Sequence, residues 1–463
     1  MEEENIMEEH GKKLGMLNIF GLGLGGAIGS GIFVLLGFGI GYTGRSIVLV
    51  CVGGCLFMLL AYMYNVIMSS MFVFKGGDYS QKALLFNPTM TGFSATMALV
   101  NSMAMSSYAL GMVNYISAVF PGVAPFTRPV AVLIMTLFFA STLRGSRFIT
   151  LLENAMTVIL IGAIAIFVIF GMPQVRPDYF SNADGGFFHG GFAGFVSAIA
   201  IMGWACQGTT MAPVSMVAVT EKPKKTIPLA ILWITLALAV IYGVMSIVAA
   251  GVLPYDQVAG ANLGATAKAI FPNSIYVVFI LGGGVFAIAT SLLGGIAMFR
   301  YPLMKIAEDG WLPPVFKKTT KGGFPWVIQL AFYLLSVMPI LLGFSLDSII
   351  SLVMIPSMVM NVYLNMACIT LPKKYPDQWK KCALRMPIPV YNIICILSAA
   401  CAGVVAFNLF KDLKGKDIIA SIAILAICVG FSLLRIHTGA VKKEFLEENK
   451  KAIIVQALAD DEE

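Results

Sequence analysis

The chain has 463 residues, of which 58% are hydrophobic and only 12% are charged, and its formal net charge is +7. Ordinary soluble domains contain about 25% charged residues, so this composition excludes a water-soluble globular protein. The sequence shows no basic groove with interleaved aromatic residues, so the positive charge does not indicate nucleic-acid binding.

Apolar runs long enough to cross a bilayer recur from residue 17 to residue 435. A helix rises about 1.5 Å per residue, so about 20 apolar residues cross a hydrocarbon core about 30 Å thick. In chain order, the predicted spans are 17–42, 46–73, 92–120, 129–143, 151–171, 191–219, 227–253, 274–300, 325–343, 347–371, 387–410 and 417–435. We therefore predict an all-α membrane protein with twelve transmembrane helices.

The distribution of basic residues predicts the orientation of these spans. With the N-terminus inside, 24 of the 31 lysines and arginines lie on the inner side and 7 on the outer side. Loops rich in lysine and arginine stay in the cytoplasm, so we expect a cell-membrane protein with both termini cytoplasmic. Segment 1–16 has no signal-peptide pattern and is expected to remain as a tail. Segment 437–463 predicts a cytoplasmic helix fading into a solvated tail, with a regulatory role as the alternative.

Residues suited to catalysis or metal binding are sparse. The eight cysteines form no CxxC pair and lie almost all within predicted spans, so we expect neither disulfides nor a metal site. The histidines are His10, His189 and His437, all outside the spans. No nucleophile or pair of acids clusters in the sequence, so we expect no enzyme and no cofactor.

Two spans are interrupted by glycine or proline near their middle. The first carries GLGLGGAIGSGIF from Gly21 to Phe33, and the sixth carries GWACQGTTMAP from Gly203 to Pro213. Interruptions at matching places in two halves are typical of inverted repeats with a binding site near the bilayer midplane. We predict five-plus-five repeats at 17–173 and 191–372, with broken helices 1 and 6 and two further helices in 387–436.

The break at Gly29-Ser30-Gly31 predicts the chemistry of the site. Unwinding frees backbone N–H and C=O groups, which are costly inside a membrane unless a ligand or side chain binds them. A zwitterion fits both needs: its carboxylate accepts from N–H groups, and its ammonium donates to carbonyls. The alternative is close helix packing, which we expect at Gly21 and Gly25.

The break in the sixth span involves Ala205, Cys206, Gln207 and Gly208. Gln207 is costly in lipid, so it should face the interior, either to contact a ligand or to form an interhelical hydrogen bond. Trp204 is expected either to close over a substrate as a gate or only to pack within the helix bundle.

Four stretches together resemble the amino acid/polyamine/organocation transporter superfamily. They are AIGSGIF (27–33), GGDY (76–79), EKPKKTIP (221–228), and Arg300 with AEDGWLP (307–313). The resemblance implies a small-molecule substrate held between spans one and six, with its carboxylate on the backbone of the GSG turn. It also implies that carbonyls of spans one and six bind the amino group, and it carries these two roles to Ile28, Gly29, Ser30, Gly31 and Ile32 and to Ala205 through Gly208. A lysine expected in span five is replaced by Leu160, so proton coupling is not favoured.

We therefore predict a permease that moves a neutral amino acid by exchange or facilitated movement. No ionised residue lies clearly at mid-depth, and Glu153 near the inner edge is expected to pair with Arg144 or Arg147, with proton carriage as the alternative. The sodium-symporter alternative would use Thr290 or Ser291, and a proton-coupled symporter and a non-transporting nutrient sensor also stay open. The expected partners are the substrate and membrane lipid, whereas the oligomeric state is not predicted. Polar side chains expected near the substrate side chain are Asn101, Ser102, Gln207, Thr290, Ser291, Ser357 and Asn361.

Overall fold

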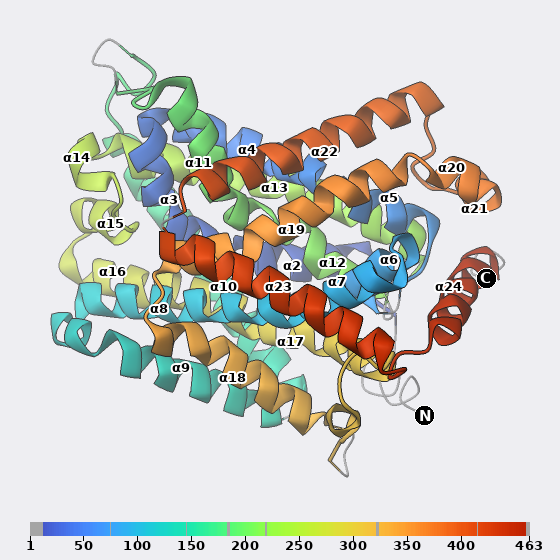
Figure 1. The fold of residues 1–463 in the computed structure, drawn as a ribbon. Helices are drawn as coiled ribbons and strands as arrows, with labels where there is room; N and C mark the ends of the chain where they lie inside the picture. The colour runs from blue at the N-terminus through green and yellow to red at the C-terminus, as the bar shows by residue number, and fades with distance from the viewer. Residues whose placement is uncertain are drawn as a thin grey trace.

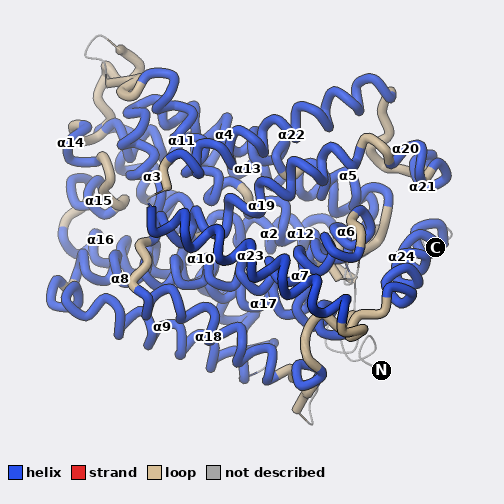
Figure 2. The backbone as a smooth tube through the Cα atoms, viewed as in Figure 1, coloured by secondary structure: helices blue, strands red, loops and turns tan. Residues whose placement is uncertain are grey.

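The computed structural model describes residues 13–74, 76–144, 146–182, 186–217, 220–320, 324–413 and 415–459. Across these ranges the chain folds into helices joined by loops and contains no β-strand (Figure 2). Nine helical runs in the described residues are long and apolar enough to cross a membrane, and Met16–Ile28 and Trp326–Leu342 are shorter apolar helices. The described residues thus form helices and loops only, and the number of long apolar helices is that of a multi-pass membrane protein.

The helices of the N-terminal half follow the predicted spans closely. They are α2 (Met16–Ile28), α3 (Ser30–Thr43), α4 (Ile47–Ala61), α5 (Met63–Met71), α6 (Gly77–Leu85), α7 (Pro88–Asn101), α8 (Met105–Val119), α9 (Thr127–Ser141) and α10 (Ser146–Gly171). Spans one, two and three are each divided between two helices. The predicted third span is divided by a 3-10 turn at Ser102–Ala104, so it is not one continuous helix.

The C-terminal half is likewise built from helices. Its helices are α11 (Gly191–Cys206), α12 (Gly208–Ser215), α13 (Pro223–Gly251), α14 (Tyr255–Val258), α15 (Gly264–Ile270), α16 (Asn273–Val278), α17 (Phe286–Glu308), α18 (Trp326–Leu342), α19 (Leu346–Cys368), α20 (Leu371–Lys374), α21 (Pro376–Lys380), α22 (Ile388–Lys411), α23 (Gly415–His437) and α24 (Lys443–Ala459). A π-helical stretch, Phe279–Val285, joins α16 to α17.

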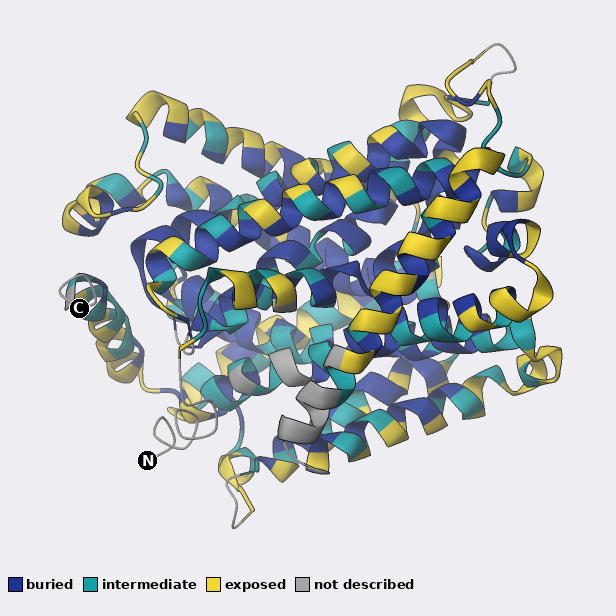
Figure 3. Ribbon diagram, turned by 180° about the vertical axis from the view of Figure 1, so that it is seen from behind, coloured by how far each residue is buried: buried dark blue, intermediate teal, exposed yellow. Residues whose placement is uncertain are grey.

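The outer faces of the bundle are apolar. Leu137 is 59% exposed, Ile161 53% and Phe407 68%. Exposed residues alternate with buried ones along the outer helices, whereas the interior is mostly buried (Figure 3). An apolar surface of this kind suits contact with lipid chains, where each helix satisfies its own backbone.

The loops gather at the two ends of the bundle. Figure 1 shows α14 and α15 at one end and α20, α21 and α24 at the other. At the first end, the Arg45 amide donates to the Gly186 carbonyl and the Gly260 amide to the Gly37 carbonyl. The alternating sequence of spans predicts this grouping, because successive loops fall on opposite sides.

The C-terminal helix α24 packs against the opposite end of the bundle. Lys450 Nζ donates to the Phe86 carbonyl at 3.0 Å, and Gln378 Nε2 donates to the Ile454 carbonyl at 3.1 Å. The helix predicted in segment 437–463 is therefore present, and it is docked on the loops.

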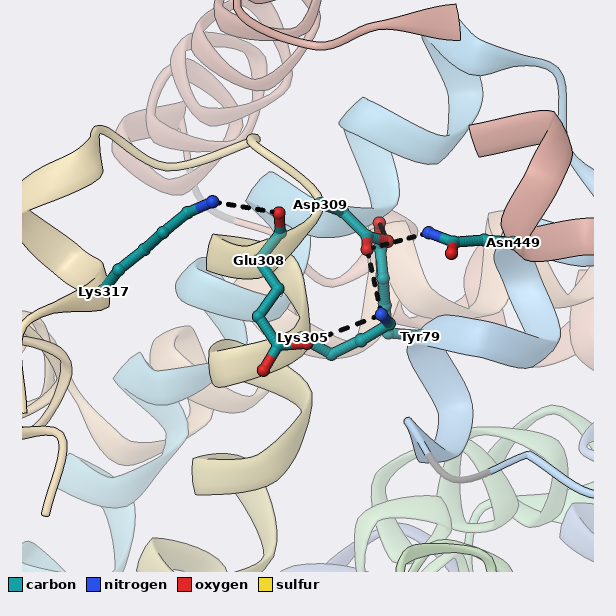
Figure 4. Close-up of polar contacts among 6 residues, drawn as sticks. All are labelled: Tyr79, Lys305, Glu308, Asp309, Lys317 and Asn449. Atoms are coloured by element: carbon teal, nitrogen blue, oxygen red, sulfur yellow. Dashed lines mark hydrogen bonds and ion pairs between the residues drawn. The ribbon is translucent and has the colours of Figure 1, made fainter. Parts of the chain in front are cut away.

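Asp309 joins α24 to two other elements (Figure 4). Its carboxylate accepts from the Tyr79 hydroxyl at 2.8 Å and from Asn449 Nδ2 at 3.2 Å, and it pairs with Lys305 Nζ at 3.2 Å. Burial and the Asp309 carboxylate raise the pKa of Tyr79 well above its usual range, so the phenol remains a donor. A buried carboxylate needs such partners, because an unpaired charge is strongly disfavoured there.

We expect Asp309→Ala to destabilise the protein by about 3 kcal/mol, because it leaves Lys305, Tyr79 and Asn449 without their shared acceptor. Thermal unfolding in detergent measures this loss, and the rate of trypsin cleavage within α24 reports whether the helix detaches. The control is Asp377→Ala, which removes an exposed pair with Lys380 and should cost about 1 kcal/mol or less. Equal effects of the two substitutions would contradict the role assigned to Asp309.

Candidate functional site

The first span breaks at the predicted place. Helix α2 ends at Ile28 and α3 begins at Ser30, while Gly29 between them has φ −40° and ψ −129°, outside the helical region. The carbonyl of Ala27, just before the break, accepts a hydrogen bond from the Tyr242 hydroxyl at 3.0 Å. One of the backbone groups beside the break is thus bound by a side chain.

The sixth span is interrupted less than predicted. Gln207 separates α11 from α12, but its φ of −78° and ψ of −21° remain helical. Its amide still donates to the Gly203 carbonyl at 3.0 Å. Because this helical bond persists, the expected unwinding over Ala205 to Gly208 is replaced by a turn at one residue.

Tyr242 of α13 connects the two interruptions. Its side chain is fully buried, and its hydroxyl lies 3.0 Å from the Ala27 carbonyl and 3.4 Å from the Ala205 carbonyl. A phenol has one proton, so it donates to one of these carbonyls at a time. Tyr242 is not among the residues predicted for the site, because a single tyrosine in an apolar span carries no signal of its partners.

Spans one and six meet at glycines. A Cβ added to Gly31 would lie 2.3 Å from the Ala205 Cα, and one added to Gly208 would lie 3.2 Å from the Ala27 Cα. Any side chain at Gly31 would therefore overlap backbone. The approach of the two spans depends on residues without side chains.

Packing of the other glycines follows the prediction only in part. A Cβ added to Gly25 would lie 3.2 Å from Thr157, so the expected close packing against α10 is present there. The same expectation for Gly21 is wrong, since an added Cβ would meet nothing within 4 Å and the residue is exposed. Gly21 faces away from the neighbouring helices.

A cavity of about 110 Å³ lies beside the two interruptions. One water needs roughly 10–15 Å³, so this volume accommodates a ligand of several heavy atoms. The lining residues are Gly26, Ala27, Gly31, Tyr62, Asp78, Lys82, Asn101, Met105, Tyr108, Trp204, Ala205, Gln207, Gly208, Met211, Ser291, Gly295, Phe299, Val353, Met354, Ser357 and Asn361.

The cavity brings together most of the predicted site. The predicted site residues that line the cavity are Gly31, Asn101, Trp204, Ala205, Gln207, Gly208 and Ser357. Of the other polar residues expected near the substrate side chain, Ser291 and Asn361 also line it.

Four predicted residues, Ile28, Gly29, Ile32 and Cys206, do not line this cavity. Ile28, Ile32 and Cys206 are packed in the hydrophobic core, because their positions on the helices turn them toward neighbouring spans. A Cβ added to Gly29 would overlap Ser291 Oγ. The side chain of Ser30 lies outside the described residues.

Several polar groups at or near the cavity already have partners. The Tyr62 hydroxyl donates to Gln207 Oε1 at 2.5 Å, so Gln207 both lines the cavity and forms an interhelical bond. Ser357 Oγ donates to the Val353 carbonyl at 3.0 Å. Of the other candidates, Thr290 Oγ1 donates to the Ala287 carbonyl and Ser102 Oγ to the Leu99 carbonyl, and neither borders the cavity.

Charged residues at the cavity correct one expectation. The sequence suggested no ionised group near the site, yet Asp78 and Lys82 line the cavity. They pair with each other at 2.5 Å, and the Tyr64 hydroxyl donates to Asp78 at 2.7 Å. Their charges are thus balanced. The prediction missed them because they follow span two in sequence and reach the cavity only through the fold of α6.

Glu153 lies against α17, where a Cβ added to Gly294 would be 3.4 Å from its carboxylate oxygen. The side chains of Arg144 and Arg147, its expected partners, lie outside the described residues.

Span two also breaks beside the cavity, at Tyr62 between α4 and α5. Asn365 of α19 binds the backbone groups on both sides of this break. Its Oδ1 accepts from the Tyr64 amide at 2.9 Å, and its Nδ2 donates to the Ala61 carbonyl at 3.0 Å. A carboxamide suits this task because it carries both a donor and an acceptor.

We expect Tyr242→Phe to lower stability by about 1–3 kcal/mol, because it removes the donor between two buried carbonyls. Thermal unfolding in detergent checks this value. Tyr333→Phe is the control, since that hydroxyl meets Thr136 on the exposed surface and its loss should change stability by about 0.5 kcal/mol or less. An unchanged unfolding temperature for Tyr242→Phe would show that the hydroxyl does not hold the two spans.

Comparison with known proteins places this geometry in context. The family described as amino acid permease matches residues 14–434. The chain is 26% identical to a branched-chain amino acid permease of Bacillus subtilis, over 83% of this chain and 86% of that protein. It is 25% identical to a methylthioribose transporter of Bacillus subtilis, over 81% and 84% of the two chains. It is also 25% identical to a D-serine/D-alanine/glycine transporter of Escherichia coli, over 66% and 67%. These names cover different small molecules, so similarity alone does not select a substrate.

Proposed function

The chain belongs to the amino acid permease family, and on that premise we propose that it carries a neutral amino acid across the cell membrane by alternating access. The observation that supports this most directly is the cavity at the meeting of Gly31 and Ala205, beside the break at Gly29. Backbone groups at such a break recognise the parts that all amino acids share.

The backbone supplies both halves of a zwitterion site. In our proposal, N–H groups at the start of α3, around Gly31, bind the carboxylate, because the N-terminus of a helix favours an anion. The carbonyls of Ala27 and Ala205 bind the ammonium. Both residues line the cavity, and Tyr242 satisfies only one of the two carbonyls at a time.

The charge balance of the cavity favours a substrate with an uncharged side chain. Asp78 and Lys82 form an ion pair, so each already has its counter-ion. A substrate with a second charge would have to break this pair or remain unpaired, and either costs several kcal/mol in a low-dielectric site. A neutral side chain avoids that cost.

We also propose how the chain crosses the membrane and to which side the cavity opens. We place twelve spans in the membrane, with inverted repeats at 17–173 and 191–372, two further helices in 387–436, and cytoplasmic tails 1–16 and 437–463. The cavity includes Asp78 and Lys82, in the segment after span two, which this topology puts on the cytoplasmic side. Trp204, whose ring lies 6.1 Å from that of Tyr108, serves as the gate opposite that side.

For coupling, we propose exchange of one substrate for another. Leu160, at the position where the family resemblance leads us to expect a lysine, is buried and apolar, so it offers no charge to replace an ion. Sodium coupling is the second candidate, and the close approach of Ser291 Oγ to Gly29 favours it. The Thr290 hydroxyl, the other expected sodium ligand, already donates to the Ala287 carbonyl. A non-transporting sensor would bind substrate without flux.

Gly26→Leu tests the cavity as the binding site. Gly26 lines the cavity, and an added Cβ meets nothing within 4 Å, so leucine should fill the cavity without disturbing the fold. A neutral amino acid at 100 times its Kd should stabilise the unsubstituted protein by about 2.7 kcal/mol. The variant should gain nothing, as measured by thermal unfolding in detergent. Gly21→Leu, on the same helix but facing away from its neighbours, should keep the full gain, and undiminished stabilisation of Gly26→Leu would exclude this cavity.

Flux through liposomes tests the coupling. Unlabelled amino acid inside the vesicles should speed entry of labelled amino acid, whereas an inward proton or sodium gradient into empty vesicles should drive little accumulation. Concentration of label by a sodium gradient would select the symporter, and concentration by a proton gradient would select proton coupling. Binding without any flux would select the sensor.

A further inference from the structure

We propose that Asn361 recognises the side chain of the substrate and selects amino acids that carry a hydroxyl or carboxamide group. This inference rests on the proposed function, because it assigns a side-chain subsite within the same cavity. It narrows the substrate class from neutral amino acids in general to those whose side chain forms hydrogen bonds.

The first observation is an unsatisfied carboxamide. Asn361 of α19 lines the cavity and is only 1% exposed, yet neither its nitrogen nor its oxygen has a hydrogen-bond partner. The neighbouring Tyr62 hydroxyl donates its single proton to Gln207, so toward Asn361 it can act only as an acceptor. Buried polar groups are almost always bonded, so an unbonded carboxamide beside a cavity indicates a ligand that completes it.

Asn365, one helical turn further along α19, provides an internal comparison. Residues four apart lie on the same face of a helix, so both carboxamides point toward span two. Asn365 uses its oxygen on the Tyr64 amide and its nitrogen on the Ala61 carbonyl, so it serves the fold. Asn361 also faces Tyr62 at this break, but it binds no backbone group there, and its Oδ1 stays available as an acceptor.

A second carboxamide lies on the same cavity. Asn101, at the end of α7, lines it with a buried Oδ1 that also has no partner. Together the two residues offer a donor and two acceptors. A group that both donates and accepts satisfies this set, as a hydroxyl or carboxamide does, whereas a carboxylate only accepts and an aliphatic chain does neither.

Several other polar residues around the cavity already have partners. Gln207 accepts from Tyr62, Ser357 donates within its own helix, and Asp78 pairs with Lys82. Among the residues that line the cavity, Asn361 and Asn101 are those whose buried polar atoms have no partner. A site of this kind rejects an apolar isostere, because binding it would bury the carboxamides without partners.

Two isosteric pairs of amino acids test the proposal without any substitution. Kd values are measured by ligand-dependent thermal shift on the full chain in detergent, for threonine against valine and for asparagine against leucine. We expect threonine and asparagine to bind about 10- to 100-fold more tightly than their apolar isosteres. Equal affinities within each pair would overturn the selectivity while leaving the proposed function intact. Absence of binding by every amino acid would overturn the proposed function, and the subsite with it.

The substitution Asn361→Leu then assigns the selectivity to a residue. In this variant the Kd values of the two amino acids in each pair should differ by no more than about threefold, mainly because threonine and asparagine bind more weakly. Asn361→Ala provides an independent second variant. The control is Asn65→Leu, which removes an equally buried carboxamide without partners that does not line the cavity. That control should retain the preference. A preference that persists in Asn361→Leu, or disappears equally in Asn65→Leu, would overturn the assignment.

Discussion

A helix that breaks inside an apolar bundle leaves backbone groups that water cannot reach, and the rest of this structure depends on how those groups are satisfied. The Tyr242 hydroxyl lies between the Ala27 and Ala205 carbonyls, and Asn365 binds both sides of the break at Tyr62. Each partner comes from a helix distant in sequence. The breaks are therefore stable only in the assembled bundle, because an isolated span could not supply these bonds.

The same constraint explains why a cavity forms where it does. Gly31 and Ala205 approach so closely that no side chain fits between them, which brings the first and sixth spans together on one side. Beside this contact the helices leave a space lined by both apolar and polar residues. Close packing and the cavity thus occupy adjacent parts of one junction: glycines allow the approach, and the carboxamides border the space beside it.

The position of the break in the first span was predictable from the sequence, whereas the directions of the side chains around it were less so. Glycine at position 29 marks a weak point in a helix whatever surrounds it, and the break is found there. Gln207 kept a helical bond that composition did not predict. Ile28 and Ile32 face the core and not the cavity, because the rotation of a helix about its axis is determined by its neighbours.

The sequence by itself determined that this is a multi-pass helical membrane protein, where its apolar helices lie, and that its first span breaks at Gly29. These properties are local, because lipid requires about 20 apolar residues in succession and glycine weakens a helix on its own. Tertiary structure alone decided that Asp78 and Lys82 border the cavity as an ion pair. It also decided that the Tyr242 hydroxyl lies between the two breaks. Finally, it decided that Asn361 lacks the backbone partners that Asn365 has. Those facts depend on contacts between helices far apart in the chain, and no single span encodes them.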